Sequence, residues 1–206
     1  NIKRSPLCGR NFEYYSEDPL LAGKLAAGFI RGAEGEGVGT SLKHFAVNNQ
    51  ETLRMSVSAE VDERALHELY LRPFEIAVKE GAPSTVMCSY NRINGVYASE
   101  NRMLLTRILR EQWGFDGLVM SDWGAVYRRP AGVAAGLDLE MPSSGGVTDR
   151  EIVRAVRAGR LDEAALDALC ARVLRLALAH APQRKKAYPA PVHNVAAVRR
   201  MLDRHH

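Results

Sequence analysis

Cysteine is scarce in this sequence, and long apolar runs are absent. The three cysteines, Cys8, Cys88 and Cys170, are scattered and odd in number, so they indicate neither a disulfide framework nor a paired metal site. No stretch approaches the roughly 20 apolar residues that a membrane-spanning helix needs, and no signal peptide is visible. We therefore expect no bound metal and no membrane partner, and the compartment is left open.

A surplus of charge of one sign is also missing from most of the chain. The formal net charge is +4, but residues 184–206 hold six Lys and Arg residues against one Asp. The whole chain has 28 basic and 24 acidic residues, so residues 1–183 contain 22 basic and 23 acidic residues and are nearly neutral. A nucleic-acid-binding domain needs a basic stripe across a folded face, so we expect no nucleic-acid partner. We interpret 184–206 as a basic linker or tail.

What the sequence does contain is a regular alternation of strand and helix patterns. Short apolar runs predict strands at 38–46, 84–90, 118–122 and 137–141. Helical patterns predict helices over 19–34, from 62 onward, near 101–113, shortly after 122, near 149–158 and over 162–180. Strands that alternate with helices favour parallel βα units, and hence an α/β fold.

Two of the predicted helices have recognisable apolar stripes. In 19–34 the stripe consists of Leu20, Leu21, Leu25, Phe29 and Ile30. In the helix that Asp62 can cap, it consists of Leu66, Leu69, Tyr70, Phe74 and Ala77. We expect both stripes to face the core. Pro130 is unfavourable inside a helix, so we expect it to shorten or kink the helix that follows residue 122.

Polar side chains stand at the ends of three predicted strands. Lys43 and His44 lie near the end of the first, Tyr90 closes the second, and Asp122 closes the third. Parallel α/β enzymes keep their working residues at the C-terminal ends of strands. Each residue alone has a plainer explanation, since a lone Asp after a strand commonly caps a helix, but their coincidence favours one shared site. Trp123, next to the acid, suits a sugar ring, because an aromatic ring stacks on the apolar face of a pyranose.

A glycine-rich segment, "GAEGEGVG" at 32–39, has the composition of a phosphate-binding loop. Phosphate-binding loops run from a strand into a helix, whereas this segment runs from a helix into a strand. A nucleotide-binding function is therefore disfavoured, and we expect no cofactor.

Five segments, taken in order, carry a resemblance to a known family. They are "GRNFEYYSEDP" (9–19), "KHFAVNNQE" (43–51), "VMCSYNRINGVYASEN" (86–101), "GFDGLVMSDWGA" (114–125) and "AGLDLEMP" (135–142). Together they resemble glycoside hydrolase family 3, the β-glucosidase family, over roughly residues 1–180. The resemblance implies an eight-stranded β/α barrel followed by an α/β sandwich domain. It also implies retaining hydrolysis of terminal, non-reducing β-linked sugars, β-D-glucosyl residues above all.

The same resemblance implies roles for individual residues. Asp122 matches the nucleophile, and a retaining enzyme needs such an ionised carboxylate beside a second carboxyl that acts first as acid and then as base. The other matching positions bind sugar: the hydroxyl ligands Arg10, Lys43 and His44, the further arginine Arg54, Tyr90 near the nucleophile, and the apolar walls Met87 and Trp123. The segment after Phe45, "AVNNQET", lacks the glycine-rich His-Asp loop of the N-acetylglucosaminidase branch, which favours the glucosidase branch.

Four predicted strands cannot close an eight-stranded barrel. We therefore expect residues 1–183 to form a partial domain, the C-terminal part of a (β/α)8 TIM-type barrel. By the resemblance, the opening strands precede Asn1 in a longer protein, and the acid/base glutamate belongs to a following sandwich domain. The expected partner is a β-linked glucoside or oligosaccharide, and a homo-oligomer of the longer protein is left open. The alternative function is a non-catalytic, carbohydrate-binding remnant of the same family.

The carboxyl groups of this chain predict that it does not hydrolyse glycosides alone. The acid/base must stand about 5–5.5 Å from the nucleophile. Asp138 and Glu140 are interpreted as structural or as lining of the sugar site. Glu13, Glu17 and Asp18 belong to a helix entrance, where acids commonly cap the helix.

Overall fold

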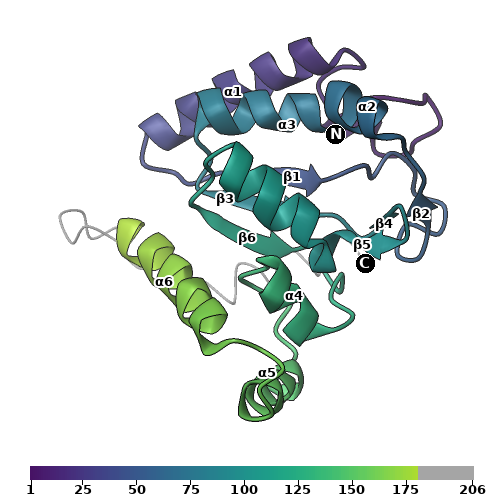
Figure 1. The fold of residues 1–206 in the computed structure, drawn as a ribbon. Helices are drawn as coiled ribbons and strands as arrows, with labels where there is room; N and C mark the ends of the chain where they lie inside the picture. Colours follow the sequence, from purple (N-terminus) through teal and green to yellow (C-terminus); the bar gives the residue numbers. More distant parts are fainter. Residues whose placement is uncertain (181–206) are drawn as a thin grey trace, which may run out of the picture.

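The computed structural model describes residues 1–180, so the predicted tail at 184–206 lies outside the described residues. Its centre is a sheet of three parallel strands in the order β1-β3-β6 (Figure 1). These strands are β1 (Ser41–Phe45), β3 (Thr85–Cys88) and β6 (Leu118–Ser121). Each strand pairs with the next one of this sheet along the chain, and an isolated parallel bridge from Met120 to Leu139 continues the order.

The predicted strands at 38–46, 84–90 and 118–122 are confirmed, each in a shorter form. The strand predicted at 137–141 is wrong as a full strand, because it forms only the bridge at Leu139. The reason lies in Asp138, whose Oδ2 accepts the main-chain N–H of Val119 at 2.8 Å. A side chain thus takes a donor that a ladder of main-chain bonds would use.

A second, small sheet was not predicted from the sequence. It joins β2 (Ser58–Ala59) in parallel to β4 (Arg92–Ile93), which pairs antiparallel with β5 (Val96–Tyr97). Strands of two residues are too short to show an alternating pattern. The one available signal is the pair Asn94 and Gly95, which turns the hairpin with φ of 49° and 86°, as a two-residue Asn-Gly turn requires.

A helical run from residue 63 to 81 packs on one face of the main sheet. It consists of α2 (Glu63–Ala65), a π-helix (Leu66–Leu71), α3 (Arg72–Ile76) and a second π-helix (Ala77–Gly81). Asp62 caps it as predicted, since its Oδ1 accepts the N–H of Ala65 at 2.9 Å. The predicted stripe is wrong at Leu69, which is 43% exposed, while Leu71 is buried. A π turn holds more residues than an α turn, which displaces the buried face.

Helix α1 (Pro19–Gly35) begins at the cap Asp18 and lies beside α3 (Figure 1). Its predicted stripe is wrong: Leu20, Leu21, Leu25 and Phe29 are exposed, and only Ile30 is buried. The buried face consists of small residues and Ile30 instead: Ala22, Gly23, Ala26, Ala27 and Ile30. A Cβ atom at Gly23 would lie 2.8 Å from the Cβ of Ile76, so small residues allow the close approach of the two helices.

The main core lies between the sheet and the helical run together with the π-helix Met103–Gln112. Its largest fully buried side chains include Phe45, Leu71, Phe74, Val86, Leu105, Leu109, Val119 and Leu137. Their burial supplies the hydrophobic stabilisation of the fold. It also fixes the strand β1, because Phe45 packs edge-on against Phe74 with ring centroids 5.2 Å apart.

The last three helices within residues 1–180 form a separate cluster on the other side of β6. They are α4 (Arg129–Ala135), α5 (Val147–Arg157) and α6 (Glu163–Ala179), and they pack through Val133, Ile152, Ala155, Leu161 and Leu169. Pro130 lies in the first turn of α4, where its missing N–H costs nothing, so α4 starts there and is short as predicted. No helix in residues 1–180 is both long and apolar enough to traverse a bilayer.

Candidate active site

The strand ends of the main sheet bring most of the predicted site residues to one edge. Phe45 pairs with Cys88 and Cys88 with Ser121 at the C-terminal ends of the three strands. His44, Tyr90 and Asp122 stand next to these paired positions, and all three are buried. The parallel register therefore sets the polar groups of three βα units side by side.

The two carboxylate oxygens of Asp122 differ in their surroundings. Oδ1 accepts the main-chain N–H of Trp123 at 2.7 Å, which fixes the orientation of the group. Oδ2 lies 3.4 Å from Nε2 of His44 and has no hydrogen-bond partner among the described residues. One oxygen is therefore anchored, and the other keeps its lone pairs for an incoming group.

His44 is neutral in the folded chain. Burial, followed by the charges of Arg10 and Lys43, lowers the pKa of His44 to about 2. Nη2 of Arg10 lies 3.0 Å from Nε2 of His44. A guanidinium can only donate, so Nε2 accepts and the ring proton resides on Nδ1. The contact between His44 and Asp122 is therefore not an ion pair.

Glu13 connects the two predicted cations of the site. It accepts a hydrogen bond from Nε of Arg10, and its Oε2 lies 3.3 Å from Nζ of Lys43. Although burial acts to raise it, the pKa of Glu13 is lowered by the hydrogen bonds from Arg10 and Lys43. The carboxylate thus remains ionised and holds both cations beside His44.

Arg54 and Tyr90 form a second pair at the same edge. The guanidinium carbon of Arg54 lies 4.7 Å from the centre of the Tyr90 ring, a cation–π geometry. Glu51 holds the arginine there, because its Oε2 accepts from Nη1 of Arg54 at 2.7 Å. Burial and the neighbouring Asp122 carboxylate raise the pKa of Tyr90, so its hydroxyl keeps its proton as a donor.

Met87 and Trp123 lie at different depths. Met87 pairs with Lys43 on one side and with Met120 on the other. These three residues form one row across the sheet, between the rows of core-facing residues. Met87 is half-buried there, whereas Trp123 is 59% exposed. Met87 can therefore form the wall of a recess, while Trp123 can form part of its rim.

Sequence reasoning did not identify Glu13 and Glu51 as parts of the site. Glu13 was interpreted as an acid of the helix entrance, and that interpretation is wrong for this residue, although Asp18 does cap α1. A signal was available, since each glutamate stands three residues from an arginine, in "RNFE" and "ETLR".

The remaining strand-end carboxyls are occupied elsewhere. Asp138 is buried between Arg110 and Arg172, at 2.7 Å from each guanidinium, so it is structural. Glu140 accepts a hydrogen bond from the hydroxyl of Thr148 and lies 3.9 Å from Arg129. Neither carboxyl is free to donate a proton to a ligand beside Asp122.

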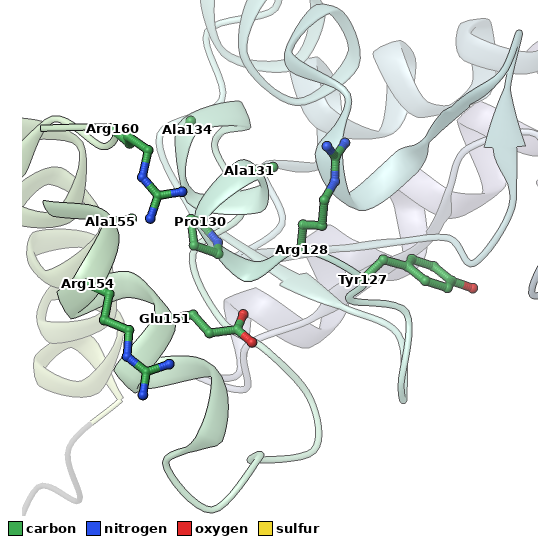
Figure 2. A pocket seen from close by; sticks show the side chains of 9 residues that line it. All are labelled: Tyr127, Arg128, Pro130, Ala131, Ala134, Glu151, Arg154, Ala155 and Arg160. Atoms are coloured by element: carbon green, nitrogen blue, oxygen red, sulfur yellow. The ribbon is translucent and has the colours of Figure 1, made fainter. Parts of the chain in front are cut away.

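A pocket of about 560 Å³ lies apart from this edge, between α4 and α5 (Figure 2). Arg128, Arg154, Arg160 and Glu151 supply its charged groups, over a floor of small side chains. None of its lining residues is a predicted site residue. Within residues 1–180, no group of three or more His, Cys, Asp or Glu side chains is arranged to hold a metal ion.

Comparison with known protein families and sequences gives a consistent result. Residues 1–176 match the model of the glycosyl hydrolase family 3 N terminal domain. Over 176 residues the chain is 58% identical to thermostable β-glucosidase B of Acetivibrio thermocellus. The matched region covers 85% of this chain and 23% of that protein. An exo-α-(1→6)-L-arabinopyranosidase of Bifidobacterium longum is 57% identical over the same length, with the same two shares. The chain thus spans about a quarter of the length of these curated relatives.

Solved structures agree with the sequence relatives. A family 3 β-glucosidase of Bifidobacterium adolescentis is 55% identical with a TM-score of 0.85, over 87% of this chain and 26% of that one. β-Glucosidase 3B of Thermotoga neapolitana, solved in complex with α-D-glucose, is 48% identical with the same TM-score and the same shares.

Proposed function

This chain belongs to glycoside hydrolase family 3, and from that premise we propose that it carries the nucleophile half of a retaining β-glucosidase site. The observation that carries the proposal is the state of Asp122. One of its oxygens is anchored by a main-chain N–H, and the other has no hydrogen-bond partner among the described residues. His44 lies beside that second oxygen, and Arg10 contacts His44. A carboxylate that is oriented through one oxygen and unpaired on the other suits the formation of a covalent glycosyl intermediate.

The proposed mechanism uses Asp122 twice. In the first step its unpaired oxygen attacks the anomeric carbon while an acid protonates the departing glycosidic oxygen. In the second step the same group, now a base, takes a proton from a water molecule that attacks the anomeric carbon, and the Asp122 carboxylate leaves. Arg10, Lys43 and Arg54 donate to sugar hydroxyls. Neutral His44 and protonated Tyr90 add hydrogen bonds without adding charge, while Met87 and Trp123 cover the apolar face of the ring.

The acid/base is proposed to come from outside this chain. Glu13 and Glu51 are held by arginines, and Asp138 and Glu140 by partners of their own. We therefore expect the 206-residue chain alone to show no enzymatic turnover, even with an aryl β-glucoside.

We place the described strands as consecutive members of a (β/α)8 barrel, its C-terminal part, with residues 1–183 as one partial domain. The order β1-β3-β6, continued by Leu139, supports this placement. A barrel wound in one direction keeps neighbours in the sequence as neighbours in the sheet.

The proposed substrate is a terminal β-D-glucosyl residue, as the names of most of the relatives suggest. A terminal α-L-arabinopyranosyl residue is a second candidate, because a relative of almost equal identity bears that name. Aryl glycosides of both sugars distinguish the two candidates.

The test is a chimera in which residues 1–176 replace the matching segment of the Acetivibrio β-glucosidase. The chimera is expected to hydrolyse an aryl β-glucoside, and Asp122→Asn is expected to lower kcat at least about a thousandfold, because the covalent route is lost. Asp116→Asn is the matched control, since Asp116 is an exposed acid just before the same strand.

Two results would contradict the proposal. Near-normal turnover in a folded Asp122→Asn chimera would remove the nucleophile assignment. A chimera that binds glucose but does not hydrolyse any glycoside would favour the non-catalytic, carbohydrate-binding alternative.

A further inference from the structure

Exposed apolar side chains occur on the segment that follows the nucleophile and on the loop that carries Arg54. Trp123 is 59% exposed, Met55 43%, Tyr127 42% and Leu53 73%. Single exposed apolar residues are ordinary, but three of these are linked. The hydroxyl of Tyr127 donates to the main-chain oxygen of Met55, and Cε of Met55 lies 3.8 Å from where a Cβ would stand at Gly124, next to Trp123.

The ring of Tyr127 also packs against a second aromatic ring. Its ring stacks on that of Tyr97, with centroids 3.6 Å apart and an angle of 16° between the planes. The guanidinium of Arg92 lies 4.4 Å from the centre of the Tyr97 ring and donates to the Tyr97 hydroxyl at 2.9 Å. Tyr97 is thus sandwiched between Arg92 and Tyr127, and Tyr127 keeps one face of its ring uncovered by this stack.

A polar recess adjoins the stacked rings. A pocket of about 350 Å³ is lined by Arg92, Tyr97, Tyr127, Glu100 and Arg128, among others. Tyr127 and Arg128 also line the larger pocket between α4 and α5, and Figure 2 shows the Tyr127 ring projecting away from the other side chains of that pocket. Aromatic walls beside charged hydrogen-bonding groups suit a sugar ring, which has apolar C–H faces and a rim of hydroxyls.

We propose that Tyr127, braced by Tyr97 and Arg92, is a stacking platform for a sugar ring of the leaving group, outside the ring that Asp122 attacks. The platform lies on the segment that connects β6 to α4, five residues after the nucleophile. It favours β-linked oligosaccharides over single glucosides. This inference rests on the proposed function, because it takes the Asp122 edge as the site of the terminal sugar.

The test is an NMR titration of the ¹⁵N-labelled 206-residue chain with glucose, cellotriose and octyl β-glucoside. Cellotriose is expected to bind about fivefold more tightly than glucose, the order of one aromatic stacking contact. Tyr127→Ala is expected to remove that gain and to leave glucose binding unchanged. Tyr127→Phe keeps the ring and should retain the gain. Phe29→Ala, an exposed aromatic on α1, is the matched control.

Each of the other possible results would contradict the proposed stacking role of Tyr127, and each points to a different cause. If glucose binds but cellotriose shows no gain, or keeps its gain in a folded Tyr127→Ala chain, the platform fails and the proposed function stands. If Tyr127→Ala weakens octyl β-glucoside and not cellotriose, the surface serves an apolar leaving group instead. If neither sugar binds, the platform and the sugar site at Asp122 fail together.

Discussion

Glu13 holds two cations of the candidate site on one carboxylate. Arg10 and Lys43 repel each other, and both contact Glu13; both are proposed to bind sugar hydroxyls. A carboxylate between them offsets the repulsion and restricts both side chains, so part of the ordering cost is met before any sugar binds.

We predict that Glu13→Gln weakens glucose binding by the 206-residue chain about fivefold, because a neutral amide cannot hold both cations. Glu17→Gln is the matched control: Glu17 is exposed, four residues farther along, and has no ion pair among the described residues. Isothermal titration calorimetry gives the two affinities. Equal glucose affinity in a folded Glu13→Gln chain would show that Arg10 and Lys43 need no such support.

At this scale, the sequence predicts the residues that lie on strands better than those on loops. His44, Tyr90 and Asp122 could be found because strand ends have a fixed place in a parallel sheet. Glu13 and Glu51 could not be placed, since the path of a loop depends on tertiary contacts that no local pattern encodes. Their spacing from Arg10 and Arg54 identifies pairs, but not that the pairs face His44 and Tyr90.

Helix α1 shows how an apolar stripe can mislead at the scale of an element. A stripe of large apolar residues predicts the core-facing side, yet α1 buries its small residues against α3. Gly23 faces Ile76 there, whereas Gly28 of the same helix has no atom within 4 Å of an added Cβ. A comparison of the same substitution at Gly23 and at Gly28 therefore distinguishes the effect of close helix packing from the effect of helix propensity.

We predict opposite effects of two identical substitutions in α1. Gly23→Ala should lower the free energy of unfolding by about 1–3 kcal/mol, because the new methyl group overpacks the contact with Ile76. Gly28→Ala should raise it by about 0.5–1 kcal/mol, because alanine restricts the unfolded chain and favours the helix. Urea unfolding measures both values. A gain in stability from both substitutions would mean that α1 and α3 can move apart freely.

The elements that the sequence predicts well have patterns of their own. The strands β3 and β6 are short, mainly apolar runs. The helices α5 and α6 lie within two residues of their predicted bounds. The small sheet of β2, β4 and β5 and the single bridge at Leu139 are set by long-range contacts, so no window of the sequence contains them.

Buried His44 makes the stability of the whole chain depend on pH. Its pKa is lowered to about 2 in the folded state, whereas an unfolded histidine titrates near 6.5. Below about pH 6.5 the unfolded chain takes up a proton that the folded chain does not. The contribution of neutral His44 to the free energy of unfolding is therefore fully present above about pH 6.5 and is lost as the pH falls below it.

We predict that the free energy of unfolding falls by up to about 2 kcal/mol between pH 7 and pH 5. Glu13 and Glu34, whose pKa values are also lowered, act mainly below about pH 4.5, the range of an ordinary carboxyl. Urea unfolding at several pH values gives the slope. His44→Gln should flatten it, and His67→Gln, at an exposed histidine, should not. Equal stability of the unmodified chain at pH 7 and pH 5 would contradict the prediction.

The strand order also determines how the chain can be assembled during synthesis. Because β1, β3 and β6 lie in the sheet in the order in which they leave the ribosome, each new strand meets a partner that already exists. Contacts between successive units close loops of a few tens of residues, which is favourable for rapid folding. The N-terminal units can therefore fold before the later ones are made. The edge that holds Asp122 forms only when β6 pairs with β3.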